Sequence, residues 1–321
     1  MAAAEPSPRR RLPRWALPLL KVLVAAVVLL AVGRTLTAAA RGLQDAPVRP
    51  AAGLAVASGA VYALAFLPMG LYWRRVLQAW GQPSGLGPVV QAYYLGHLGK
   101  YVPGKALVVV LRTGSLRAAG GQTAAIAASV FVETLTLMAL GGVLSGVLLT
   151  IPRFAAGQPA WLVVVAFGLA AGSLLPICPP VMNRLIAFYE ARRQDAPAAE
   201  PHRLSWGLFA AGWLAAAVTW CGLGASLWLA VRSCLPGFEL SINHWLACLL
   251  AAALPVVAGF LSLIPGGLLV RDGLMVALLT PTAGPEVALA ATVLVRLAWI
   301  GSEAVVCGIL VAAARVVRLG G

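Results

Sequence analysis

Long runs of apolar residues, separated by short polar connections, dominate this chain. A run of about 18 or more apolar residues is long enough to cross the hydrocarbon core of a bilayer as a helix. The apolar runs cover about 15–33, 53–73, 124–150, 160–178, 207–231, 244–264 and 286–312. The pattern therefore predicts an all-α integral membrane protein with about seven to eight transmembrane helices.

Two further apolar stretches, about 87–112 and 265–281, are each interrupted by a Pro-Gly step. Irregular backbone at membrane depth is tolerated only inside protein or against a wet cavity. Proline fits the first turn of a helix, where its missing N–H is not needed. We therefore expect re-entrant or broken-helix segments in which Pro103 and Pro265 begin half-helices. Whether each segment re-enters or crosses stays open.

A long apolar segment that carries its own charge follows each Pro-Gly step. Glu133 follows the first step, and Arg296 and Glu303 follow the second. A charge at the bilayer centre costs about 2.5–3.5 kcal/mol on insertion scales, so such residues are functional candidates by default. Arg296 and Glu303 are seven positions apart and so share one helix face. A purely structural buried ion pair is the alternative interpretation.

The two Pro-Gly steps also reveal an internal repeat. Glu133 follows Pro103 by 30 residues, and Arg296 follows Pro265 by 31. Duplicated halves related by a pseudo-two-fold axis are common in transporters, whose substrate site lies between the halves. We hypothesise that Glu133 and Arg296 face each other, or a shared cavity, near such an axis.

These features define a candidate binding site for a lipid headgroup. Half-helix starts and nearby cations favour an anion, such as the phosphate of a phospholipid or polyprenyl-phosphate headgroup. For Lys100 and Lys105, snorkelling of the side chain to the membrane interface is an equally good interpretation. The candidate residues are Lys100, Pro103, Gly104, Lys105, Arg112, Glu133, Pro265, Gly266, Gly267, Arg271, Asp272, Arg296 and Glu303.

Composition restricts the function further. The chain is 61% hydrophobic and 11% charged, and spans with short connections leave no room for a soluble catalytic domain. The net charge of +14 is explained by basic loops under the positive-inside rule, so no nucleic-acid partner is expected. The cysteines and histidines lack metal-ligand spacing, and no phosphate-binding nucleotide loop is present, so no cofactor is expected.

The distribution of charge along the chain predicts its organisation. The basic N-terminus, 1–14, is expected in the cytoplasm, with 15–315 forming a single transmembrane domain of the cell membrane. The halves are expected at about 53–150 and 207–312, joined by a hydrophilic linker at 189–205. The side of the C-terminus and the oligomeric state stay open.

Two stretches of the sequence resemble the motif blocks of a known family. The first runs from Tyr94 through Lys105 to Glu133, and the second from Phe260 to Arg296. Over essentially the whole chain, these residues resemble the lysylphosphatidylglycerol synthase transmembrane-region (flippase-like domain) family. The family pattern of the second block is Pro-Gly-Gly-x-Gly-x-Arg-Glu. This chain has Leu269 where the pattern has its third glycine, and Asp272 where the pattern has glutamate.

The first block departs further from the family pattern. The family has a glycine and then an acid after Pro-Gly, and Glu-Arg in the following helix. Here these places hold Lys105-Ala106-Leu107 and Glu133-Thr134. The lost acid and the added lysine indicate a change in the charge of the ligand.

The resemblance implies a function in lipid translocation. Family members with an attached aminoacyl-transfer domain make aminoacylated phosphatidylglycerol and move it across the bilayer. The expected activity here is therefore that of a flippase for a phosphate-bearing lipid, either an aminoacylated phospholipid or a polyprenyl-phosphate-linked one. The alternatives are an intramembrane lipid-modifying enzyme, with Glu133 or Asp272 as base, and a non-transporting partner of a glycosyltransferase or lipid-synthesising enzyme.

Overall fold

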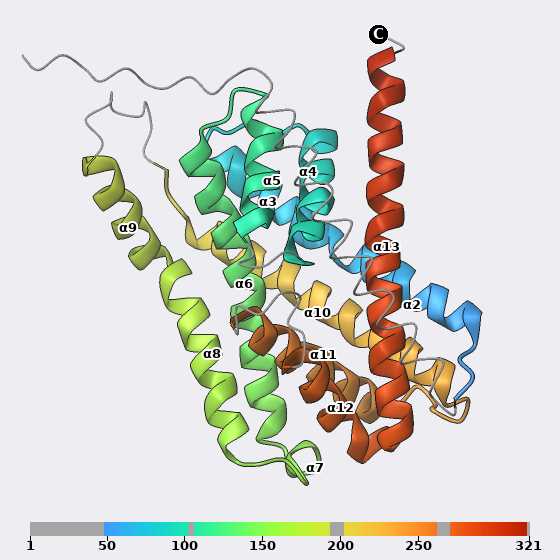
Figure 1. Ribbon diagram of the computed structural model, residues 1–321. Coiled ribbons are helices and arrows are strands. Elements are labelled where there is room, and N and C mark those ends of the chain that lie inside the picture. Colours follow the sequence, from blue (N-terminus) through green and yellow to red (C-terminus); the bar gives the residue numbers. More distant parts are fainter. Residues whose placement is uncertain (1–47, 102–105, 193–201, 262–269, 320–321) are drawn as a thin grey trace, which may run out of the picture.

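A computed structural model describes residues 48–101, 106–192, 202–261 and 270–319, and these residues form helices and connections without a strand (Figure 1). The helices are α2 (Ala52–Ala65), α3 (Leu67–Ala79), α4 (Leu86–Leu98), the short 3-10 turn η1 (Gly99–Tyr101), α5 (Ala106–Arg117), α6 (Thr123–Leu149), α7 (Pro152–Ala155), α8 (Trp161–Ile177), α9 (Pro179–Arg192), α10 (Trp206–Cys234), α11 (Ile242–Leu261), α12 (Val270–Ala283) and α13 (Pro285–Leu319). The predicted all-α fold is confirmed.

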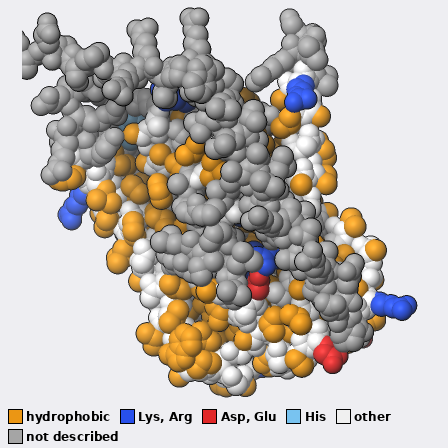
Figure 2. Space-filling model, in the orientation of Figure 1, with side chains coloured by type: hydrophobic (Ala, Val, Ile, Leu, Met, Phe, Trp, Pro, Cys, Tyr) orange, Lys and Arg blue, Asp and Glu red, His pale blue; other side chains and the backbone are white. Residues whose placement is uncertain are grey.

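Five helical segments of the described chain are long and apolar enough to cross a membrane. These are Ala52–Ala79, Thr123–Leu149, Trp206–Cys234, Ile242–Phe260 and Pro285–Arg315. A sixth results if α8 and α9, which meet at a 52° bend, are counted as one span. The predicted span at 15–33 lies outside the described residues. Hydrophobic side chains dominate the described part of the face drawn in Figure 2, as expected of a multi-pass membrane protein.

Proline chemistry explains the bend between α8 and α9. Pro176 lies inside the last turn of α8, where it cannot donate a helical hydrogen bond. Cys178 precedes Pro179 and is extended, with ψ of 127°, because a proline disfavours the helical conformation of the residue before it. The chain therefore leaves the first helix and begins the second in a new direction.

Helices α2 and α10 pack antiparallel along a seam of small residues. The Ser58 and Ser226 hydroxyls each donate to the other residue's backbone carbonyl, both at 2.8 Å. Seven residues, or about two helical turns, farther along the seam, the Thr219 hydroxyl donates to the Ala65 carbonyl at 2.8 Å. A reciprocal contact between two segments is the signature of a two-fold relation. The Ser58–Ser226 pair therefore marks a pseudo-two-fold axis between the helices.

The order of elements repeats on either side of this axis. In the first half, α2 and α3 are followed by the pair α4–α5 and by the long α6; in the second, α10 is followed by α11–α12 and α13. Helix α6 descends in Figure 1, whereas α13 ascends toward the C-terminus. This order agrees with the two pseudo-symmetric halves predicted from the repeat, and the opposite directions of α6 and α13 agree with an inverted relation between them. Helices α7 to α9 connect them.

The Pro-Gly steps fall between paired helices. Helix α4 packs against α5, and α11 packs against α12. Helices α4, α5 and α12 have 13, 12 and 14 residues, which at about 1.5 Å per residue is too short to cross a core of about 30 Å. Helices α5 and α12 begin at Ala106 and Val270, shortly after Pro103 and Pro265 in the sequence. The arrangement of α4 and α5 agrees with a re-entrant segment.

Close packing in the α4–α5 pair depends on Gly99. A Cβ atom added there would lie 2.6 Å from the Val108 backbone nitrogen and 2.8 Å from the Leu107 carbonyl carbon. Backbone atoms cannot rotate away, so Gly99→Ala is expected to destabilise the protein by about 1–3 kcal/mol. A fall in the thermal unfolding midpoint in detergent would test this. Gly114→Ala, also on α5 but with nothing within 4 Å of the added atom, is the matched control and should not lower the midpoint.

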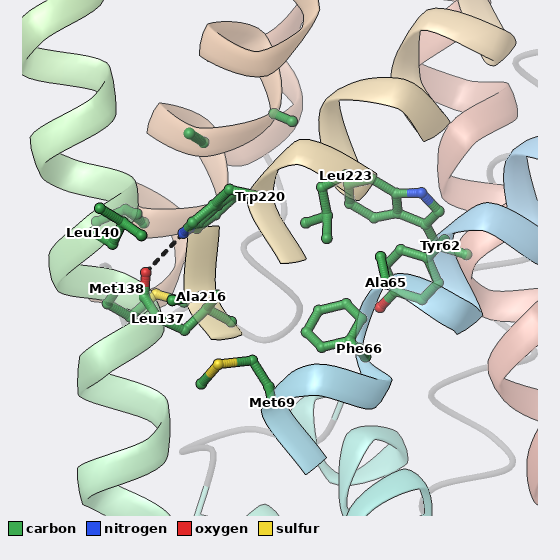
Figure 3. Close-up of a cluster of buried hydrophobic side chains, with 14 of the residues drawn as sticks. Tyr62, Ala65, Phe66, Met69, Leu137, Met138, Leu140, Ala216, Trp220 and Leu223 are labelled. Atoms are coloured by element: carbon green, nitrogen blue, oxygen red, sulfur yellow. Dashed lines mark hydrogen bonds between the residues drawn. The ribbon is translucent and has the colours of Figure 1, made fainter. Parts of the chain in front are cut away.

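The main buried cluster lies where the two halves meet. Figure 3 shows side chains of α2, α3, α6 and α10 pointing toward one another. Trp220 on α10 has no exposed surface, and its indole N–H donates to the Leu137 carbonyl on α6 at 2.9 Å. This bond satisfies the one polar atom of a large apolar side chain, which fixes α10 against α6.

The described ends of the linker predicted at 189–205 belong to the folded structure. Helix α9 continues to Arg192, so the first residues of the predicted linker are helical. Near its other end, Leu204 is buried, and both of its backbone groups bond the Asn183 side chain. An apolar side chain close to the start of α10 anchors the end of this connection.

Candidate functional site

A cavity of about 380 Å³ lies between the two halves. Residues of α2, α4, η1, α5 and α6 line it from one side, and residues of α10 to α13 line it from the other. Most of its wall is apolar and includes five side chains labelled in Figure 3: Tyr62, Phe66, Leu137, Met138 and Leu223. Its titratable side chains, apart from Tyr62, are His97, Lys100, Arg112, Glu133 and Arg271. Apolar walls with a few convergent polar groups are typical of small-molecule sites.

Arg112 and Glu133 form a buried ion pair within the first half. Arg112 Nη1 donates to Glu133 Oε2 at 2.6 Å, and both side chains are only 3% exposed. The Arg112 guanidinium lies 4.2 Å from the ring centroid of Tyr93, whose hydroxyl donates to Glu133 Oε1 at 3.1 Å. A pair this deep in an apolar bundle is stable only with such additional contacts.

A glycine on α4 makes room for this ion pair. A Cβ atom on Gly96 would lie 2.6 Å from Arg112 Cγ and 2.7 Å from its Nε. Gly96 belongs to the run Gly96-His97-Leu98-Gly99, which therefore admits both the arginine side chain and the α5 backbone.

Asp272 joins two arginines in the second half. Arg271 Nε donates to Asp272 Oδ1 at 3.2 Å, and Arg296 Nη1 donates to the other oxygen, Oδ2. Arg271 and Arg296 are each 9% exposed. The Arg271 guanidinium also lies 5.9 Å from the ring of Trp299. One carboxylate thus serves two cations.

Glu133 and Arg296 are predicted to face either each other or a shared cavity. Their direct pairing is wrong, and of the two only Glu133 is among the described residues that line the cavity. Glu133 pairs with Arg112 on α5, and Arg296 pairs with Asp272 on α12. Each of these two charges finds its partner on the short helix that precedes its own long helix in the same half. The signs are exchanged between the halves, because the first half has cation before anion and the second has anion before cation. The equivalence of the two positions holds, but their contact does not.

Glu303 connects the two halves. It is 2% exposed on α13, and its carboxylate accepts hydrogen bonds from Lys100 Nζ, the Tyr62 hydroxyl and, at 3.0 Å, the Tyr101 hydroxyl. His97 Nδ1 lies 3.6 Å from the same carboxylate. These four partners belong to α2, α4 and η1 of the first half. We call Tyr62, His97, Lys100, Tyr101 and Glu303 the inter-half cluster.

Lys100 points into the protein, toward Glu303. Its ammonium is paired with Glu303 and lies 5.2 Å and 5.5 Å from the rings of Tyr101 and Tyr62, rather than extending to an interface. The remaining candidates from the sequence, Pro103, Gly104, Lys105, Pro265, Gly266 and Gly267, lie outside the described residues.

Sequence reasoning missed the aromatic hydroxyl donors of the site. Tyr101 and His97 flank Lys100 in the first motif block, and this proximity could have drawn attention to them. Tyr62 and Tyr93 carry no such signal, because they lie in ordinary apolar helices and reach the carboxylates only through folding.

The site offers unsatisfied hydrogen-bond donors that suit an anion. Among the residues described, no three His, Cys, Asp or Glu side chains come together as a set of metal ligands. By contrast, Nε of Arg112 and both Nε and Nη2 of Arg296 are buried without a hydrogen-bond partner. Buried N–H donors without acceptors are costly, and an anionic ligand would satisfy them.

Comparison with family models identifies a relationship. The family described as lysylphosphatidylglycerol synthase TM region matches residues 19–300. This range includes both Pro-Gly steps and Arg296, while Glu303 lies just beyond it. A search of the curated proteins finds no match.

Proposed function

Because the chain belongs to the lysylphosphatidylglycerol synthase transmembrane-region family, and so has a membrane-lipid-related function, we propose that it is a lipid flippase. In this proposal it moves a phosphate-bearing lipid across the cell membrane. The family assignment supports a lipid as the substrate. The proposal that this lipid is translocated rests on the cavity between the two halves.

The cavity between the inverted halves is the observation that carries the proposal. Inverted repeats with a binding site at their interface characterise secondary transporters. The cavity offers apolar side chains to the lipid body, while Lys100, Arg112 and Arg271 supply cations for a phosphate. The same cavity therefore presents apolar surface for acyl chains and cations for a phosphate headgroup.

The same geometry suggests how the lipid would pass. The Ser58–Ser226 contact at the pseudo-two-fold axis is a natural pivot for one half against the other. The inter-half cluster contributes Tyr62, His97 and Lys100 to the cavity wall and would hold the two halves together while intact. Alternating exposure of a fixed site by rocking of two repeats follows the general pattern of such folds.

Neighbouring residues of α5 allow a sharp test. Val109 lines the cavity, whereas Val110 does not and is 57% exposed. The protein is reconstituted into vesicles, and leaflet exchange of a fluorescent phospholipid is followed by quenching of the outer leaflet. Val109→Trp, which fills the cavity, is expected to slow exchange by about tenfold or more, equivalent to about 1.4 kcal/mol or more. Val110→Trp should exchange lipid like the parent.

Three other outcomes would contradict the proposal. A lipid product that accumulates without leaflet exchange would identify an intramembrane enzyme. Absence of both exchange and product, with a glycosyltransferase or lipid-synthesising enzyme copurifying, would identify a membrane partner protein. Equal slowing by both tryptophan variants would show that the lipid does not pass through this cavity.

A further inference from the structure

The charged residues in and around the cavity do not balance. They are the cations Lys100, Arg112, Arg271 and Arg296 and the carboxylates Glu133, Asp272 and Glu303. One positive charge is therefore left over among the described side chains.

Every carboxylate of this group is already engaged by a cation. Glu133 accepts from Arg112, and Glu303 accepts from Lys100. Asp272 is shared by Arg271 and Arg296. Tyr93 further occupies Glu133, and Tyr62 and Tyr101 further occupy Glu303. An incoming ammonium group would therefore find no carboxylate without a competing cation.

Unused donors, by contrast, are present where the excess charge lies. Arg296 is 91% buried, and its Nε and Nη2 have no hydrogen-bond partner among the described residues. Its only carboxylate partner, Asp272, is also bound by Arg271, which lines the cavity. Arginine N–H groups match the oxygen atoms of a phosphate, and such charge-assisted bonds are about twice as strong as neutral ones.

We propose that the cavity takes a lipid whose headgroup is net anionic, with a phosphate that no ammonium group balances. Arg271, which lines the cavity, binds this phosphate first. Arg296 joins it as Asp272 gives up part of its hydrogen bonding to the two arginines. The inference rests on the proposed function and restricts its substrate class. Aminoacylated phospholipids, whose ammonium groups would meet the excess cations, are excluded.

Lipid selectivity in vesicles tests the substrate class. Fluorescent lipids with the same acyl chains would be compared: phosphatidylglycerol, lysyl-phosphatidylglycerol and phosphatidylcholine, with a polyprenyl monophosphate as a fourth. Anionic lipids are expected to exchange at least about tenfold faster than the lysyl lipid, the effect of about one charge-assisted hydrogen bond. Exchange of the lysyl lipid at an equal or higher rate would overturn the inference. Preference between phosphatidylglycerol and the polyprenyl monophosphate identifies which anionic lipid is the source of the phosphate.

A binding measurement makes the inference independent of transport. Short-chain phosphatidylglycerol should raise the unfolding midpoint of the detergent-solubilised protein, because a ligand stabilises the state that it binds. Short-chain phosphatidylcholine should raise it less. Inorganic phosphate is the control for a site that recognises free phosphate rather than a lipid. If phosphate alone stabilises as strongly as the lipid, the site does not require a lipid and the inference fails.

Three variants separate phosphate binding from structure. Arg296→Gln should abolish most of the stabilisation by phosphatidylglycerol, and the exposed Arg153→Gln should not change it. Asp272→Asn should lower the midpoint of the empty protein but enlarge the shift caused by the anionic lipid, because both guanidinium groups are then free to bind it. A purely structural role for Asp272 predicts no enlarged shift, and that result would contradict the inference.

The two proposals fail in different ways. If all the lipids exchange at the same rate, the protein is a flippase, but the inferred selectivity for anionic lipids is contradicted. Stabilisation by the anionic lipid without any exchange leaves the anionic site and removes the flippase. If neither lipid exchange nor stabilisation by the anionic lipid is observed, both proposals are contradicted.

Discussion

Replacement of Glu133 by glutamine is expected to lower the free energy of unfolding by about 3 kcal/mol. The change leaves the Arg112 guanidinium buried without its carboxylate, and losing one partner of a buried pair typically costs about 3–5 kcal/mol. We expect the lower end of that range, because the rings of Tyr93 and Trp73, 4.2 Å and 5.1 Å from the guanidinium, continue to stabilise the cation.

Equilibrium unfolding in mixed micelles measures this loss of stability. Glu286→Gln, the same change at an exposed position in the first turn of α13, is the matched control and should have little effect. If Glu133→Gln is no more destabilising than this control, the ion pair does not hold α5 to α6.

A double variant then separates stability from transport. Removing both charges, as in Arg112→Met with Glu133→Met, should restore most of the stability, since apolar replacements of buried pairs are often neutral or stabilising. If the pair serves lipid transport, this stable variant should still exchange lipid more slowly than the parent. Full exchange in the double variant would show that the pair is structural.

The long helices could be predicted from the sequence because their signal is local. Apolar runs predicted the spans near 53–73, 124–150 and 207–231, and the helices there begin within a few residues of the predicted positions. The Pro-Gly steps predicted short helices for the same reason, since proline limits its neighbours directly. The bend after Pro176 has the same local cause but was not predicted.

The partners of the buried charges could not be predicted in this way. The repeat gives Glu133 and Arg296 equivalent positions, but equivalent residues of an inverted repeat meet only if they lie on the axis. The residues that do lie there are Ser58 and Ser226, whose small side chains allow two backbones to approach. The preceding charges, Arg112 and Asp272, held the missing information, because each lies on the short helix before its partner's long helix, 21 and 24 positions ahead of that partner.

Hydroxyl donors were harder still to predict. Tyr62 and Glu303 are 241 positions apart, and the sequence around Tyr62 is that of an ordinary apolar helix. Only packing of α2 against α13 brings them together. A buried carboxylate predicts that donors exist, because unsatisfied buried charge is costly, but it does not identify them.

Glu303→Gln is expected to loosen α13 from the first half and expose Cys307. Cys307 follows Glu303 by four positions, so it lies on the same helix face, and it is only 5% exposed. Because the Lys100 side chain is 29% exposed, we estimate the loss at about 1.5–2 kcal/mol rather than the full cost of a buried pair. Labelling of Cys307 by a maleimide, which follows the population of locally open states, should therefore accelerate by about tenfold or more.

The protein's other cysteines provide internal controls for this experiment. Cys248 on α11 has no exposed surface and should stay protected, whereas Cys221 on α10 is already exposed and should react equally in parent and variant. Lys100→Met breaks the same contact from the other half and should accelerate Cys307 in the same way. If Cys307 is unchanged in both variants, the inter-half cluster does not hold the halves together. If Cys248 is exposed as well, the variants unfold the protein instead of opening the contact between its halves.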